Sequence, residues 1–155
     1  MMETALVFDH EGRTIHWHEP LGRSGGSIPD SRDLWSVLWE HRSKKNGGTG
    51  RLAGVAHTHP WDGPTGASRT DLTTFRAVEL GLGQRILWPI VTFTHVRWWV
   101  RHADLTHAAL SEMEPWEVMS PRDYVPGRGP IRWGLNDVEE LRGRSRTLAP
   151  VTNNN

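Results

Sequence analysis

Alternating apolar and polar residues near the start of the chain predict a β-hairpin. Its two strands cover residues 4–8 (TALVF) and 13–19 (RTIHWHE), and the DHEG segment between them favours a turn. Period-two alternation gives the second strand one face made of Ile15, Trp17 and Glu19. Because two large apolar residues share this face, we expect it to be buried, with Glu19 pointing inward. His16 and His18 occupy the other face and are expected at the surface.

Helical periodicity and runs of strand-forming residues alternate along the rest of the chain. The predicted elements are a helix at 30–42, a strand at 52–57, a helix from 68 to about 82, strands at 86–94 and 96–101, and a short helix at 136–141. Pro89 favours an edge or a bulge for the strand that contains it. This order predicts one α/β (α+β) domain over residues 1–141, with a mixed, curved sheet flanked by helices, followed by a mobile tail at 142–155.

Composition narrows the classes of function. The 155 residues suit one domain, and 18 basic residues balance 18 acidic ones, so the charge does not favour nucleic acid or an anionic membrane as a partner. No apolar run is long enough for a membrane helix, and the N-terminus lacks the pattern of a signal peptide. The absence of cysteine fits a reducing compartment, so a cytoplasmic location is expected. Any metal ion must be held by histidines and carboxylates.

A candidate metal site follows the predicted strand at 52–57. His57 and His59 are separated by one residue at the end of this strand, so their imidazoles project from the same face. A loop rich in glycine and proline leads to the next helix, whose first turn presents Asp71. Two histidines and one aspartate would hold zinc and leave one position open, which is typical of a catalytic site. The alternative is an incidental His-x-His pair on a strand.

Zinc-assisted hydrolysis also needs a base and a donor to the oxyanion. Glu19 is the candidate general base, and Ser68 is the candidate donor to the tetrahedral intermediate. Glu40 is the rival base, but it lies opposite the stripe of Leu34, Trp35, Leu38 and Trp39 on its helix. Ser68 with Asp71 is alternatively an ordinary capping box. Trp61, in the loop between the ligands, is either a wall of a substrate groove or a loop anchor.

The ordered set His57-x-His59-Pro60, seven residues, Ser68-x-x-Asp71 closely resembles the JAMM motif of the JAB/MPN+ metalloproteases. The resemblance extends over about residues 4–99. It implies the JAB/MPN fold, which is similar to that of cytidine deaminases. It also implies Zn²⁺ on the two histidines and the aspartate, Glu19 as the residue that activates water, and Ser68 as the oxyanion donor.

The resemblance implies a zinc metallopeptidase or isopeptidase. Its expected substrate is a protein or peptide with an extended C-terminal tail, plausibly cut after the terminal glycine of a ubiquitin-like protein. Two alternatives remain open. One is a non-catalytic scaffold or interaction module on the same fold, and the other is a zinc peptidase for cell-wall peptides or a sulfur-carrier precursor.

Overall fold

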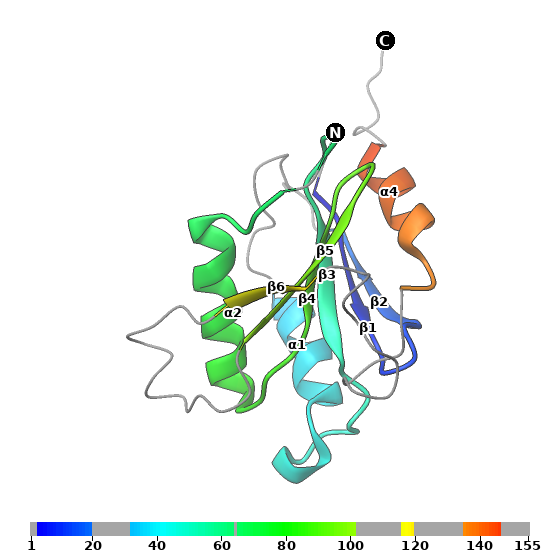
Figure 1. The fold of residues 1–155 in the computed structure, drawn as a ribbon. Helices are drawn as coiled ribbons and strands as arrows, with labels where there is room; N and C mark the ends of the chain where they lie inside the picture. The colour runs from blue at the N-terminus through cyan, green and yellow to red at the C-terminus, as the bar shows by residue number, and fades with distance from the viewer. Residues whose placement is uncertain (1–2, 20–31, 64, 102–115, 120–134, 147–155) are drawn as a thin grey trace.

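A six-stranded mixed sheet forms the centre of the structure (Figure 1). The computed structural model describes residues 3–19, 32–63, 65–101, 116–119 and 135–146. The strands are β1 (Ala5–Phe8), β2 (Thr14–His18), β3 (Gly54–Thr58), β4 (Trp88–Val91), β5 (Val96–Arg101) and β6 (Trp116–Met119). Their order across the sheet is β2-β1-β3-β4-β5-β6, and only the β3–β4 pair is parallel. The predicted mixed α/β architecture is therefore confirmed.

Helices cover both faces of this sheet. The helices are α1 (Arg32–His41), α2 (Arg69–Leu82) and α4 (Val138–Arg146), with a short 3₁₀ helix at Lys44–Asn46. Figure 1 shows α2 and α4 on opposite sides of the strands. None of the helices in the described ranges is long and apolar enough to cross a membrane.

Each face of the sheet has its own apolar core. On the side of α1 and α2, the buried cluster is Ala5, Val7, Leu38, Leu52, Val55, Phe75, Leu82, Ile86, Trp88 and Ile90. On the side of α4, it is Leu6, Phe8, Ala53, Ala56, Leu87, Val91, Trp98, Val100 and Leu141. Neighbours along β1 alternate between the two clusters, because successive strand residues point to opposite faces. The central strands are thus buried on both faces.

The last helix extends beyond its predicted end. A helix ending at 141 and a mobile tail from 142 were expected, but α4 continues to Arg146. Leu141 and Ser145, one turn apart, are both fully buried. These two buried positions hold the end of the helix against the sheet, and the tail prediction is wrong for residues 142–146. The remaining nine positions of the predicted tail lie outside the described residues.

The predicted face of β2 is wrong for Ile15, because the pairing of β2 with β1 contains a β-bulge. The register shifts between Val7, which faces His16, and Phe8, which faces Thr14. Ile15 consequently packs against the α1/α2 core, whereas Trp17 packs against the α4 core. A bulge inserts one residue and breaks period-two alternation.

His18 is on the face opposite Trp17, as predicted, but it is not at the surface. It lies opposite Ala5 in the register and is only 3% exposed.

Pro89 lies in an interior strand and not at an edge. β4 is hydrogen-bonded between β3 and β5, with Pro89 facing Trp98 on β5. On its β3 side the pairing is divided into an isolated Gly54–Leu87 bridge and the His57–Ile90 pairing. Proline lacks the N–H that the ladder needs, so this interruption is the local irregularity that proline requires inside a sheet.

The tryptophans of α1 also depart from the predicted stripe. Leu38 is buried, but Trp35 and Trp39 are 36% and 45% exposed and stack on each other with ring centroids 6.0 Å apart. Arg42 covers the Trp39 ring at 3.7 Å from its centroid. The buried stripe of the helix is therefore narrower than the sequence predicts.

Candidate metal centre

The two histidines lie where the buried strand β3 ends. His57 is within β3 and faces Ile90 of β4, and His59 follows the strand, with its N–H donating to the Val91 carbonyl. Both residues are buried, at 7% and 5% exposure. The parallel β3–β4 pair therefore fixes the backbone on both sides of the histidine pair.

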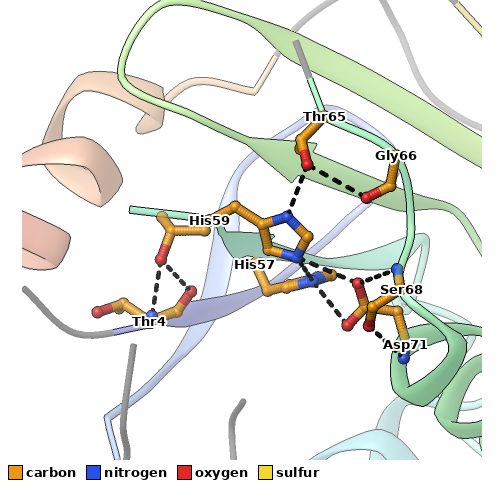
Figure 2. Close-up of polar contacts among 8 residues, drawn as sticks. Thr4, His57, His59, Thr65, Gly66, Ser68 and Asp71 are labelled. Carbon is orange, nitrogen blue, oxygen red and sulfur yellow. Dashed lines mark hydrogen bonds and ion pairs between the residues drawn. The ribbon is translucent and has the colours of Figure 1, made fainter. Parts of the chain in front are cut away.

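Helix α2 brings Asp71 to these histidines. Ser68 caps the helix: its side chain accepts from the Asp71 N–H at 3.0 Å, and the Asp71 carboxylate accepts from the Ser68 N–H at 3.0 Å. This reciprocal capping box fixes the rotamer of Asp71 while its carboxylate faces the sheet. Figure 2 shows the carboxylate and both imidazoles converging on one point.

The distances within this group fit the ligands of one small cation. The Nε2 atoms of His57 and His59 are 3.3 Å apart, and Asp71 places Oδ1 3.2 Å from the first and Oδ2 3.1 Å from the second. Zinc binds such atoms at about 2.0–2.2 Å, and in a tetrahedron ligands at that distance are separated by about 3.3–3.6 Å. Within the described part of the chain, these three residues form the one group of histidines and acids close enough to hold a metal ion.

The electrostatics of Asp71 favour its ionised form. Burial opposes ionisation, but hydrogen bonds with His57 and His59, the charge of His57 and the Ser68 N–H outweigh it and lower the pKa of the carboxyl below its usual range. A carboxylate held ionised beside two imidazole nitrogens can bind a divalent cation without first losing a proton.

Glu3 is a second buried acid at this site, and the sequence analysis missed it. Ala5 faces His57 in the β1–β3 register, so continuing the pairing by two residues puts Glu3 level with His59 on the same face of the sheet. Glu3 is only 2% exposed. Burial, and after it the negative charge of Asp71, raises the pKa of Glu3 to about 8. An acid with this pKa beside a candidate metal centre can exchange a proton near neutral pH.

Hydrogen bonds of Thr58 connect the segment that contains Glu3 to the histidine pair. Its backbone N–H donates to the Thr4 carbonyl at 2.9 Å, and its hydroxyl accepts from the Thr4 N–H at 2.8 Å. Both residues are buried. Figure 2 shows Thr4 beside the histidine pair. Since Thr4 follows Glu3 and Thr58 lies between the two histidines, these bonds hold the acid and the ligands in one rigid unit.

The structure places neither candidate base of the sequence analysis with these ligands. Glu19 is in an ion pair with Arg144 of α4, whose guanidinium also covers Trp17. That packing puts Glu19 with the α4 face of the sheet, whereas the histidines and Asp71 meet on the α2 face. Glu19 shares the face of Trp17, as the alternation predicts, but this face packs against α4 and not against α2. Glu40, as expected, is exposed, and its carboxylate lies 3.5 Å from His41.

Ser68 forms the capping box, which is one of the two alternatives that the sequence left open. The capping box places the Ser68 hydroxyl beside Asp71, which is one of the candidate ligands (Figure 2). The bond from the Asp71 N–H uses a lone pair of Ser68 Oγ and not its proton. The hydroxyl proton can therefore still be donated to a reacting group.

Trp61 lies over the candidate centre. Its ring centroid is 4.7 Å from that of His59, and the residue is 45% exposed. The backbone anchors this position, since the Trp61 carbonyl accepts from the Phe93 N–H at 3.0 Å. An exposed aromatic ring that packs against a candidate ligand can contact both that ligand and an incoming molecule.

The fold and the site define a mixed α/β protein in which two buried histidines and a partly buried aspartate could bind a metal ion. Comparison with models of known protein families and with curated protein sequences found no match.

Proposed function

We propose that this protein is a zinc-dependent hydrolase that cleaves a peptide or isopeptide bond. The observation that carries the proposal is the convergence of His57, His59 and Asp71 within metal-ligand distances, with the buried Glu3 beside them. The resemblance of the segment 57–71 to the JAMM motif supports the same activity and the JAB/MPN fold.

Zinc is the metal that suits these ligands best. Two imidazole nitrogens and one carboxylate oxygen are a common ligand set of catalytic zinc, which keeps a further position for solvent or substrate. When bound, zinc supplies Lewis acidity to the scissile carbonyl and to the attacking water.

The protein's own residues would supply the remaining chemistry. Glu3 takes the proton of the attacking water and returns it to the leaving amine, a role that suits its raised pKa and sheltered position. Ser68 donates its hydroxyl proton as a hydrogen bond to the oxyanion that forms at the carbonyl. Glu3 replaces Glu19 in this proposal, because Glu19 is held by Arg144.

The proposed substrate is a protein or peptide that enters with an extended C-terminal tail. The motif resemblance favours a ubiquitin-like protein cut after its terminal glycine. A sulfur-carrier precursor and a cell-wall peptide contain the same class of bond and are the alternative substrates. A non-catalytic scaffold has no need of three aligned ligand atoms next to a buried acid, so the geometry favours an enzyme.

Metal analysis combined with cleavage assays tests the proposal. We expect purified protein to contain about one zinc per chain, and the His57→Ala variant to contain none. The zinc-loaded protein is then offered a ubiquitin-like protein with a C-terminal amide fluorophore, a sulfur-carrier fusion and cross-linked cell-wall peptides. Cleavage that requires His57 supports the proposal and identifies the substrate class. Zinc binding without cleavage of any of the three would favour the scaffold.

A further inference from the structure

Both ring nitrogens of His59 have a hydrogen-bonding partner. Nε2 lies 3.1 Å from the Asp71 carboxylate, and Nδ1 lies 3.1 Å from the hydroxyl oxygen of Thr65. The Thr65 hydroxyl in turn lies 3.3 Å from the Gly66 carbonyl, to which it can donate. Figure 2 shows this chain of contacts, running from Asp71 through the His59 ring to Thr65 and Gly66.

The number of protons available for these hydrogen bonds determines which ring nitrogen of His59 is protonated. A hydroxyl has one proton, so when Thr65 donates to Gly66 its oxygen can only accept from His59. In the metal-bound protein the ring proton then lies on Nδ1, and the lone pair of Nε2 is directed at the ion that His57 and Asp71 also hold. A metal ion needs this tautomer, because the nitrogen that binds it must be unprotonated.

We propose that Thr65 is a positioning residue that holds the proton of His59 on Nδ1 and thereby prepares Nε2 to bind the metal ion. The inference rests on the proposed zinc site and adds a residue outside the ligand set. The partner of the second ring nitrogen orients a metal-bound histidine and increases its basicity, and loss of such a partner costs about 10- to 100-fold in metal affinity. The Gly66 carbonyl completes the arrangement by accepting the hydrogen bond of the Thr65 hydroxyl.

Thr65→Val is the direct test, because valine keeps the branched shape and removes the hydroxyl. We expect this variant to bind zinc about 10- to 100-fold more weakly than the wild type in competition with a chromogenic chelator. Thr65→Ser keeps the hydroxyl and should bind nearly as tightly as the wild type. Thr73→Val is the matched control, since it removes an exposed hydroxyl that donates to a backbone carbonyl, that of Arg69, away from the ligands.

NMR of the zinc-loaded proteins separates this role from a general loss of structure. Long-range ¹H–¹⁵N spectra should show His59 protonated on Nδ1, with slow solvent exchange of this proton in the wild type and Thr65→Ser and faster exchange in Thr65→Val.

Wild-type zinc affinity and exchange in Thr65→Val would overturn the role of Thr65 and leave the zinc site standing. A wild type that binds no zinc would overturn both proposals. Weaker zinc binding by Thr65→Val in a protein that cleaves no substrate would support Thr65 and refute the hydrolase.

Discussion

Ala5 and His57 face each other across the β1–β3 pair, and this register determines which acid reaches the candidate metal centre. Two residues before Ala5, Glu3 lies level with His59. Glu19, two strands from the histidines, is paired with Arg144 on the α4 side. The structure thus places Glu3 next to the candidate metal centre and Glu19 away from it.

Replacing each glutamate with glutamine distinguishes their roles. Glu3→Gln should retain zinc and lose about 100- to 10,000-fold in kcat, because an amide has no basic carboxylate for the proton transfer. Glu19→Gln should keep kcat close to that of the wild type. The partly exposed pair with Arg144 is worth at most about 1 kcal/mol of stability. The measurements are steady-state kinetics and zinc content. An inactive, fully folded Glu19→Gln with an active Glu3→Gln would reverse the assignment.

Glu3 should also make the stability of the metal-free protein depend on pH. Its pKa is raised from the usual 4.5 to about 8, so between these values the folded state keeps a proton that the unfolded state releases. The free energy of unfolding should therefore decrease as pH rises from about 5 to about 8, by at most about 1.4 kcal/mol per pH unit from this one group.

Urea unfolding of the metal-free wild type and Glu3→Gln at several pH values in this range measures the effect. The difference between the two proteins isolates Glu3, because every other side chain is the same in both. The variant should gain stability relative to the wild type as pH increases. A difference that is constant with pH would show that Glu3 ionises normally in the folded protein.

The grouping of the three candidate ligands was predictable from the sequence, because the signals for it are local. His57 and His59 share a strand end, and Asp71 lies in a capping box, so short-range spacing alone brings the three toward one another. Strand-forming runs and helical periodicity likewise predict most of the elements.

The wrong predictions concern features that depend on pairing between strands far apart in the sequence. The bulge in β2 separates Ile15 from Trp17, and no local pattern marks it or shows that α4 covers the face of Trp17 and Glu19. The position of Glu3 depends on the pairing of β1 with β3, which are separated by more than 45 residues. One local signal does exist: Glu3 continues the alternating series of the buried Ala5 and Val7. A glutamate in phase with a buried strand face is costly unless it has a function or a partner.

Glu79 is a structural acid whose loss should destabilise the fold. It is fully buried on α2, where its carboxylate accepts from the Ile86 N–H at 3.2 Å and from the Trp88 indole N–H at 2.8 Å. Glu79→Ala leaves both donors without this acceptor, and each buried unpaired donor costs about 1–3 kcal/mol. We expect chemical denaturation to show a loss of several kcal/mol. Glu79→Gln, which keeps an acceptor oxygen, should lose less; equal losses would contradict the role of these two bonds.

Ser68 should contribute separately to stability and to catalysis. Ser68→Ala removes the helix cap, at a cost of about 0.5–2 kcal/mol, and removes the proposed oxyanion donor, at a cost of about 100- to 1,000-fold in kcat. Ser68→Thr keeps a hydroxyl and should preserve most of both. Thermal unfolding and kinetics of the two variants provide the measurements. A Ser68→Ala protein with reduced stability and unchanged kcat would leave Ser68 with the capping role alone.

Zinc binding should stabilise the folded protein through the three ligands, because the unfolded chain does not hold them together. At a free zinc concentration 100 times the dissociation constant, the expected gain is about 2.7 kcal/mol. For a chain of this length, that corresponds to a rise in Tm of roughly 5–10 °C, which a chelator should reverse. Asp71→Asn is the sharpest control, since the amide oxygen can still accept from the Ser68 N–H and keep the helix capped. Its Tm without zinc should fall, because the neutral amide loses the charge interactions with the two histidines, and added zinc should no longer raise it. An undiminished zinc effect in Asp71→Asn would mean that the ion binds elsewhere on the protein.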